Sequence, residues 1–429
     1  MVKFKTYPDY TESGIEWLGD IPDHWEVKKF KHYYVSSMGN TILKEELSED
    51  SVTPVYSATE LVEILGYIDN PSVILYRDDF IIPARGNSIG HVKLVVDEEC
   101  TCTQTTIYAK KQYPGRINPS FVYWYQIGLR KKLYEFDNTA IPQLTVRQVK
   151  ENPILVPQMG EQQAIASFLD RETARIDALI QKKERMIELL KEKRIALITQ
   201  AVTKGLNPNV PMKDSGIEWL GEVPEHWEVK RLKYVSSCND ESLPETTDPD
   251  FEILYVDISS VSRILGITAK EEMSFEDAPS RARRKVKDGD TIVSTVRTYL
   301  RAIAPIENAE DNLIVSTGFA VLRPVSVYSG YLSLVIQSHF VVESIVAMSV
   351  GVSYPAINAS DIGDICITNP PLSEQREIVD KVRKATYRID EMQSKNEQSI
   401  TLLREYRSSL IHHAVTGKID LRGYDAKAQ

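Results

Sequence analysis

Two long stretches of the chain repeat apolar residues at helical spacing. In residues 157–205 the apolar positions recur with Lys, Arg and Glu between them, and no Pro or Gly occurs between Gly160 and Gly205. Residues 370–422 hold a second stretch of the same kind. The pattern predicts two amphipathic helices, each of about 40 residues and about 60 Å in length. The apolar positions are Ile165, Leu169, Ile176, Leu179, Met186, Leu190, Leu197 and Ala201 in the first stretch, and Ile378, Val382, Ala385, Ile389, Met392, Leu403, Leu410 and Ala414 in the second.

The chain contains two copies of one design. Residues 13–26 read SGIEWLGDIPDHWE, and the segment returns as SGIEWLGEVPEHWE at residues 215–228. Residues 141–205 also align without gaps with residues 354–418, at a larger offset, so the second copy carries inserted residues between its matched ends. Such a repeat predicts two related domains. Because the first helix leaves the first domain and enters the second, a two-fold arrangement requires the second helix to run back, antiparallel to the first.

The stretches outside the helices combine short β-rich runs, turns and one helical pattern, which predicts α/β domains. In both copies a strand leads into a loop that carries arginine, at residues 83–90 and 294–301. The predicted strands lie at residues 26–31, 73–76, 80–82, 101–108, 251–256, 291–296 and 318–322, and a helix is predicted over residues 121–134. The predicted organisation is a first domain over residues 1–156, a helix over 157–205, a second domain over 206–369, a helix over 370–422 and a tail over 423–429.

Composition and charge restrict the class of protein. The formal net charge of −10 and the pI near 5.4 argue, taken alone, against nucleic-acid binding driven by electrostatics. The sequence has no apolar run of about 18 residues and a polar amino terminus, which predicts a cytoplasmic protein. The cysteines lack the paired spacing of a disulfide framework or a zinc site, so reduced structural thiols are expected at Cys100, Cys102, Cys238 and Cys366.

Few residues are candidates for catalysis. Residues 369–372 read Asn-Pro-Pro-Leu, close to a motif of amino-methyltransferases, but Leu replaces the aromatic residue that would stack on a base. The pair His412 and His413 has no counterpart in the first copy, so we interpret it as part of a solvated helix face. His24 and His226 precede equivalent tryptophans and are interpreted as turn or capping residues, because no orienting partner lies nearby in the sequence. We therefore expect neither catalytic nor metal-binding residues in this chain.

Basic residues gather in the second globular stretch despite the acidic balance. Affinity for DNA depends on the number of neutralised phosphates rather than on net charge, and Arg and Asn on loops can read guanine and adenine edges. The alternative is an ordinary solvated charge run. The candidate DNA-binding residues are Arg77, Arg85, Asn87, Ser88 and Lys93 in the first copy, and Arg281, Arg283, Arg284, Lys285, Arg297, Tyr299 and Arg301 in the second.

The duplicated motifs resemble those of the DNA-specificity subunits of type I restriction-modification systems. The resemblance rests first on the duplicated segments at residues 13–26 and 215–228, called the Trp-His segments below. It also rests on the proline followed by Glu-Gln at residues 157–162 and 370–375, on Arg-Ile-Asp within each helix and on Ala-Val-Thr at its end. It covers nearly the whole chain. It implies that each globular stretch is a target-recognition domain for one half of a split DNA sequence. It also implies that the antiparallel coiled-coil helices set the distance between the two halves.

The resemblance further implies partners and cofactors. Two modification subunits are expected to dock on the helices, bind S-adenosylmethionine and methylate adenine, while restriction subunits use ATP and Mg and cleave DNA; no cofactor is expected on this chain. Residues 41–140 and 241–353 share little identity, so the two half-sites should be unlike and the target asymmetric. The alternative is a coiled-coil adaptor that does not bind DNA, which the acidic pI favours and the duplicated motifs disfavour. The bases that are read do not follow from the sequence.

Overall fold

A computed structural model describes residues 4–58, 63–113, 115–134 and 143–424. The chain divides into two compact units: unit 1 comprises Met1–Lys182 with Gln398–Gln429, and unit 2 comprises Lys183–Glu397. Each unit therefore holds one globular domain and a part of both long helices. Residues 141 and 142 of the predicted repeat and residues 425–429 of the predicted tail lie outside the described residues.

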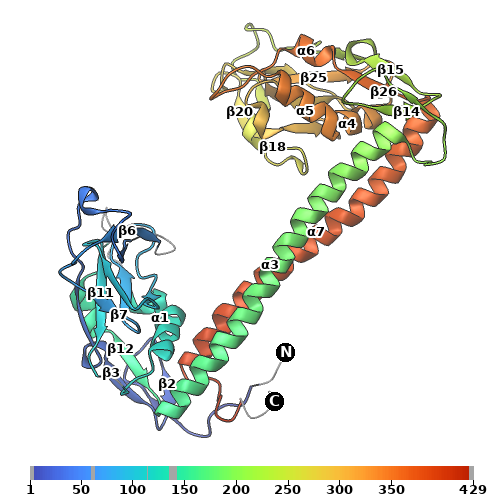
Figure 1. Cartoon of the computed structure of the whole chain (residues 1–429). Helices are drawn as coiled ribbons and strands as arrows, with labels where there is room; N and C mark the ends of the chain where they lie inside the picture. Colours follow the sequence, from blue (N-terminus) through green and yellow to red (C-terminus); the bar gives the residue numbers. More distant parts are fainter. Residues whose placement is uncertain (1–3, 59–62, 114, 135–142, 425–429) are drawn as a thin grey trace. The chain divides into compact units, whose positions relative to one another are not determined.

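Both predicted long helices are present (Figure 1). Helix α3 spans Met159–Lys204 and helix α7 spans Leu372–Val415. Helix α7 ends before Gly417, whose φ of +70° favours glycine, and not at residue 422 as predicted. In unit 2, Lys183 Nζ donates to Asn396 Oδ1 at 3.2 Å and Arg194 lies 3.5 Å from Asp390, so the two helices run antiparallel there.

Two four-stranded sheets form the globular domain of unit 1. The first has the order β6-β5-β10-β7 and the second the order β4-β11-β8-β9, and the pair β5 and β10 is parallel. The strands are β6 Ile64–Ile68, β5 Thr53–Tyr56, β10 Glu99–Cys102, β7 Leu75–Tyr76, β4 Tyr34–Met38, β11 Thr106–Lys111, β8 Phe80–Pro83 and β9 Lys93–Leu94. Around them lie β1 Tyr10–Glu12 paired with β2 Asp20–Pro22, β3 Glu26–Lys29 paired with β12 Pro153–Val156, α1 Pro119–Leu133, α2 Val146–Glu151 and the 3-10 turns Phe30–His32 and Lys44–Glu46.

The globular domain of unit 2 has the same strand order. Its sheets are β20-β17-β24-β21 and β16-β25-β22-β23, with β17 and β24 parallel, so the repeat extends into the regions that share little identity. The strands are β20 Glu271–Ser274, β17 Glu252–Val256, β24 Leu313–Ser316, β21 Ala282–Lys285, β16 Ser236–Cys238, β25 Phe319–Pro324, β22 Thr291–Ser294 and β23 Ile303–Pro305. The remaining elements are β13 Met212–Asp214 with β14 Glu222–Pro224, β15 Glu228–Arg231 with β26 Cys366–Asn369, β18 Val261–Ser262 with β19 Gly266–Ile267, α4 Ser329–Gln337, α5 His339–Met348, α6 Ala359–Gly363, and the 3-10 turns Leu232–Tyr234, Ile258–Ser260 and Thr298–Leu300.

Some predicted elements differ from those observed. Residues 101–108 form parts of two strands, because Thr106 N–H donates to Thr103 O at 3.0 Å and reverses the chain between them. The strand predicted over residues 73–76 begins only at Leu75. Helices α4 and α5 were not predicted, since most of their residues are apolar and give no clear amphipathic period.

Helices α4 and α5 are also the most apolar helices of the chain. No single helix among the described residues has both the length and the apolar composition to span a membrane, whereas α4 and α5 together satisfy that test but bend by 60°. Tyr331 to Gln337 of α4 are all buried inside unit 2. Burial against the sheet and the long helices therefore accounts for the apolar composition of α4.

The Trp-His segment of each unit contacts the ends of both long helices. His24 Nε2 lies 3.0 Å from Glu161 Oε2 at the start of α3, and the equivalent distance from His226 to Glu374 at the start of α7 is 2.9 Å. Each histidine therefore has a carboxylate partner that is distant in sequence, which the prediction of a turn or capping residue did not include. In unit 1, Trp25 is buried beside Gly417, just beyond the end of α7.

The Trp-His segment of unit 2 makes the equivalent contact with the end of α3. In unit 2, Trp227 is buried beside Gly205, just beyond the end of α3. Gly205 has a φ of +75°, as Gly417 has +70°, so glycine is favoured at both helix ends. Each unit thus receives the start of one long helix and the end of the other.

The Glu-Gln pairs explain how each globular domain is attached to its helix. Gln162 Oε1 accepts a hydrogen bond from Asn118 N–H, and its Nε2 donates to Pro157 O, both at 2.8 Å. Gln375 repeats both bonds with Tyr328 N–H and Pro370 O, again at 2.8 Å. Both glutamines are buried, so each amide pairs with two backbone groups, the N–H of a half-buried residue and a buried carbonyl.

A second repeated contact joins the strand that follows each Trp-His segment to a carboxylate. Lys29 and Lys31 each place Nζ 2.6 Å from Glu151. In unit 2, Arg231 and Lys233 surround Asp364 in the same manner. The bonds from Lys29 and Lys31 lower the pKa of Glu151 to about 2.

We predict that Gln162→Ala destabilises the protein by about 1 to 3 kcal/mol, because it leaves the buried Pro157 carbonyl without a partner and removes the bond from the half-buried Asn118 N–H. Denaturant unfolding followed by far-ultraviolet circular dichroism measures the change. The matched control is Gln163→Ala, which removes the exposed neighbouring side chain and should change the stability by less than about 0.5 kcal/mol. Equal effects of the two variants would contradict the anchoring role.

The depressed pKa of Glu151 gives a second prediction. The stabilisation from this carboxylate is fully present above its unfolded pKa near 4.5 and is lost as the pH falls toward about 2. Glu151→Gln should therefore reduce the dependence of the unfolding midpoint on pH between these values. Thermal unfolding across that pH range tests the effect, with Glu16→Gln, an exposed carboxylate, as the control. An unchanged pH dependence in Glu151→Gln would refute the assignment.

Candidate nucleic-acid interface

The loop after β22 places two arginines in the left-handed backbone conformation. Arg297 has φ +51° and ψ +47°, and Arg301 has φ +52° and ψ +39°. They bracket the 3-10 turn Thr298–Leu300. This conformation costs an L-residue with a side chain about 1 to 2 kcal/mol. Such strain persists only where the surrounding structure fixes the backbone, and it is concentrated at functional sites.

The equivalent loop of unit 1 can be identified from repeated hydrogen bonds. Leu144 N–H donates to Ala84 O, and Ile357 N–H donates to Thr295 O, both at 2.9 Å. Leu144 and Ile357 are repeat equivalents, so Ala84 and Thr295 are equivalent as well. The loop after β8 in unit 1 therefore corresponds, residue by residue, to the loop after β22 in unit 2.

Glycine occupies both left-handed positions in unit 1. Gly86 has φ +77° and Gly90 has φ +69°, and these residues correspond to Arg297 and Arg301. The backbone conformation is thus a property of the shared loop, and glycine adopts it without steric cost. In unit 2 two arginines adopt it in spite of the strain. The two copies therefore differ at both left-handed positions, with glycine in unit 1 and arginine in unit 2.

A neighbouring segment, residues 349–356, holds the arginine loop in place. Thr298 Oγ1 donates to Ser349 Oγ at 2.8 Å, and the Arg297 guanidinium lies 5.2 Å from the centre of the Tyr354 ring. Tyr299 is 54% exposed, Tyr354 is 67% exposed and Val352 is fully exposed. Sequence reasoning missed Tyr354 and Val352, although apolar residues in a Gly- and Ser-containing loop were a usable signal. Cationic, aromatic and aliphatic groups therefore share one surface.

The basic strand β21 lies close to the arginine loop. Thr317 N–H donates to Arg281 O, and Thr295 N–H donates to Gly318 O, both at 2.7 Å. The turn between β24 and β25 therefore joins the exposed Arg281 to the start of the loop that carries Arg297. The structure brings these two predicted residues to one side of the domain.

The other predicted basic residues near β21 are partly engaged within the protein. Arg283 packs its guanidinium 4.3 Å from the centre of the Phe275 ring, and Arg301 pairs with Glu343 at 2.8 Å. Arg284 and Lys285 are half-buried on β21, whose outer edge bonds to the preceding chain: Leu243 N–H donates to Arg283 O at 2.8 Å and Lys285 N–H donates to Glu241 O at 3.2 Å. The basic run therefore has a structural role as well, and only part of its charge faces solvent.

The first copy exposes three of its five predicted residues. Arg77, Arg85 and Asn87 are exposed, and the latter two share the loop after β8. Ser88 is 1% exposed, so its hydroxyl is not available at the surface in this conformation. Lys93 packs Nζ 3.6 Å from the centre of the Tyr56 ring, and burial lowers the pKa of Lys93.

Hydroxyl groups adjoin the loop of unit 1, and sequence reasoning did not select them. Thr103 Oγ1 donates to Ser57 Oγ at 3.1 Å and lies 2.8 Å from Thr105 Oγ1. Ala84 N–H donates to Thr105 O at 2.9 Å, which attaches this cluster to the loop. Hydroxyls can donate and accept hydrogen bonds, as contacts to phosphates and base edges require. Residues 101–108, which contain both threonines, are predicted from the sequence only as a strand.

The two motifs considered above for catalysis lie at a junction between a strand and a helix and on the surface of a helix. Residues 369–372 form the junction between β26 and α7, where Asn369 Oδ1 accepts from Gln375 Nε2 at 3.3 Å. His412 and His413 are exposed on α7. Within the described ranges, no group of three or more His, Cys, Asp or Glu side chains could hold a metal ion. All four cysteines are free, and burial raises the pKa of Cys100 to about 12.

The comparison of the two loops gives a prediction for Arg297→Gly. Relief of about 1 to 2 kcal/mol of strain should be offset by the lost contact with Tyr354 and by the greater entropy of glycine in the unfolded chain, each about 0.5 to 1 kcal/mol. The unfolding free energy should therefore change by less than about 1 kcal/mol. The reciprocal variant Gly86→Arg should destabilise unit 1 by about 1 to 2 kcal/mol. A loss above about 2 kcal/mol in Arg297→Gly would show that the arginine is structural.

Comparisons with known proteins give matches over most of the chain. A family model for the type I restriction modification DNA specificity domain matches residues 22–189 and residues 224–402. The MjaVIII specificity subunit of a type I restriction enzyme from Methanocaldococcus jannaschii is 21% identical, over 94% of each chain. The EcoDI specificity subunit from Escherichia coli is also 21% identical, over 71% of each chain. The two family matches fall on the two copies of the repeat.

Two solved structures share the fold. One, from a study of complex assembly and conformational transition of the type I R-M system, superposes with a TM-score of 0.71 at 15% identity and covers 93% of this chain and 99% of its own. The HsdS subunit from Thermoanaerobacter tengcongensis gives a TM-score of 0.54 at 16% identity, covering 95% of this chain and 100% of its own. The α/β architecture with two long helices, predicted from the sequence, is confirmed.

Proposed function

Since the chain belongs to the family of type I restriction-modification DNA specificity domains, we propose that it selects the DNA sequence on which a type I complex acts. On this proposal the chain binds double-stranded DNA through its two globular domains. Each domain reads one half of a split target with the loop after β8 or β22. The chain contributes recognition, while the chemistry belongs to partner subunits.

The pair of arginines at glycine-favouring positions is the observation that supports this proposal most directly. A guanidinium can donate two parallel hydrogen bonds to guanine O6 and N7 in the major groove, or bind a phosphate. Arg297 is exposed beside Tyr299 and Tyr354, and Arg281 adds a positive charge on the same side. A DNA-facing role explains why a strained backbone carries arginine here. A requirement for stability would favour glycine, as in unit 1.

The contrast between the two loops supports a target with unlike halves. Unit 1 offers Arg85, Asn87 and the half-buried hydroxyls of Ser57 and Thr105. Unit 2 offers Arg297, Tyr299 and Arg301 on the equivalent loop. Because equivalent frames present different side chains, the two domains should read different bases and define an asymmetric sequence.

The long helices suggest where partner proteins dock. Apolar side chains remain exposed along both helices, which is typical of protein-binding surfaces when they are contiguous. They include Leu179, Met186 and Leu189 on α3, and Tyr387, Met392 and Leu402 on α7. We assign these faces to two modification subunits, and through them to restriction subunits. S-adenosylmethionine, ATP and Mg would bind to those partners rather than to this chain.

A methylation map tests the proposal. DNA is compared from cells that express this chain with its neighbouring modification subunit and from cells that express the modification subunit alone. We expect new methyladenine at one split, asymmetric sequence only when this chain is present. Arg297→Gly should relax or abolish one half-site, and Arg85→Ala should affect only the other. The loss of a bidentate guanine contact costs about 1 to 3 kcal/mol of discrimination, which is about fivefold to 150-fold in methylation rate.

The same experiment identifies the alternatives. A stable complex that produces no new methylation would favour the coiled-coil adaptor. A palindromic target would contradict the assignment of unlike half-sites. If Arg297→Gly and Arg85→Ala altered the same half-site, the division of the target between the two domains would be wrong.

A further inference from the structure

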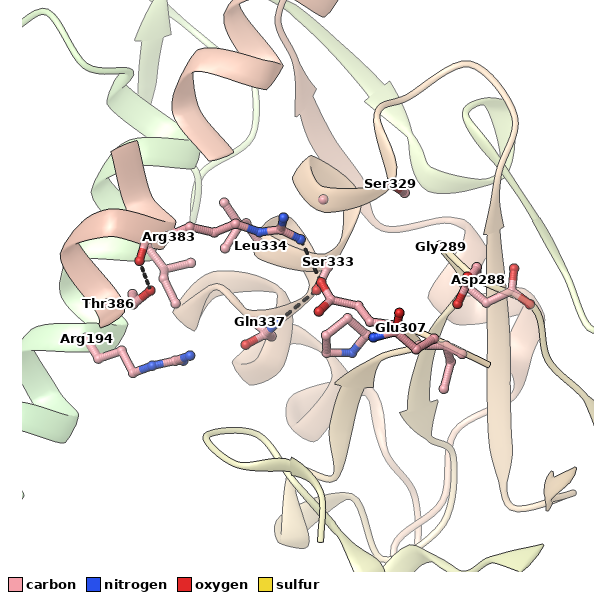
Figure 2. Close-up of a pocket in the computed structure, with 16 residues that line it drawn as sticks. Arg194, Asp288, Gly289, Glu307, Ser329, Ser333, Leu334, Gln337, Arg383 and Thr386 are labelled. Carbon is pink, nitrogen blue, oxygen red and sulfur yellow. Dashed lines mark hydrogen bonds and ion pairs between the residues drawn. The ribbon is translucent and has the colours of Figure 1, made fainter. Parts of the chain in front are cut away.

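A cavity of about 460 Å³ lies within unit 2, between its globular domain and its parts of the long helices (Figure 2). Helix α3 contributes Arg194, α7 contributes Arg383 and α4 contributes Leu334. Asp288 and Glu307 lie on the opposite side, near the ends of β22 and β23. This volume is within the range of small-molecule sites, about 300 to 1,000 Å³.

The equivalent position in unit 1 is filled by a tryptophan. Asn118 and Tyr328 are the N-cap residues of α1 and α4, and each is bound through its backbone N–H by the anchoring glutamine of its unit. Trp124 follows the cap of α1 by the same number of residues as Leu334 follows the cap of α4, so the two residues occupy equivalent helix positions. The smaller side chain of Leu334 leaves the space of an indole ring unfilled.

The contacts of Trp124 identify the walls of the site. Its side chain is buried, its Nε1 donates to Asp170 Oδ1 at 2.7 Å, and the guanidinium of Arg407 lies 5.9 Å from the ring centre. The repeat aligns Asp170 with Arg383 and Arg407 with Arg194, and both of these arginines line the cavity. The same wall positions therefore surround an indole in unit 1 and an open cavity in unit 2.

The hydrogen-bonding character of the helical wall is reversed in unit 2. Asp170 accepts the indole N–H in unit 1, whereas Arg383 offers donors at the same position. Arg194 Nε makes no hydrogen bond among the described residues, but it forms an ion pair with Asp390 at 3.5 Å. Glu307 pairs with Arg383 at 2.6 Å, so this pair joins the two walls, and Asp288 is a second carboxylate on the far wall.

We propose that this cavity binds a planar heteroaromatic molecule of the size of an indole or a purine. The edge of the ring that faces Arg194 carries hydrogen-bond acceptors. The edge that faces Asp288 carries a donor. Adenine has both features, since its ring nitrogens accept and its exocyclic amino group donates. This site is separate from the DNA-reading loops and does not depend on the proposed function.

Calorimetric titration of the full chain with adenine and with indole tests the proposal. We expect adenine to bind at least about tenfold more tightly than indole, because indole has a donor but no ring-nitrogen acceptor for Arg194. Leu334→Trp should lower the affinity for adenine by at least about tenfold, since the new indole fills the cavity as Trp124 fills its counterpart. No DNA is present, so the result is independent of sequence recognition.

A matched variant in unit 1 controls for folding and for ring selectivity. Trp124→Leu should open the corresponding space, and added indole should then raise the thermal midpoint of this variant by restoring the bond to Asp170. Indole should not raise the midpoint of the unmodified protein to the same extent. The proposal is overturned if the unmodified chain binds neither compound up to its solubility. It is equally overturned if Leu334→Trp binds adenine as tightly as the unmodified chain.

Discussion

The buried amides of Gln162 and Gln375 hold each globular domain on its long helix. Each amide satisfies one backbone N–H at the start of a domain helix and one carbonyl before the long helix, all at 2.8 Å. A buried amide without these partners would be costly, so the geometry is strongly determined. The positions of α1 and α4, of the sheets behind them and of the loops after β8 and β22 follow from this attachment. The pairs His24–Glu161 and His226–Glu374 reinforce it.

A shared frame makes the two copies an internal comparison. Where the frame is the same, a difference in side chain reports a difference in role. Glycine at positions 86 and 90 shows what the loop backbone prefers, and arginine at positions 297 and 301 shows a preference that was overridden. Trp124 shows that a ring fits between domain and helices, and Leu334 leaves that space open. Neither contrast would be visible in a protein with a single domain.

The sequence predicted what depends on local pattern. The long helices followed from regular apolar spacing without Pro or Gly, and the two-copy organisation followed from the Trp-His segments. Contacts between distant residues were not predictable: His24 meets Glu161 across 137 positions. The inward orientation of Ser88 and the packing of Lys93 on Tyr56 depend on how the loop and the sheets fold together. Helices α4 and α5 were missed because burial on most sides removes the periodic signal.

The anchoring glutamines form their shortest bonds with backbone groups, which every non-proline residue provides. The attachment is therefore largely indifferent to the identity of the side chains in the domain that it holds. A different domain that presents a free N–H at its helix cap can therefore be held by the same glutamine. The side chains of a domain can change extensively without loss of the bonds that attach it to the long helices.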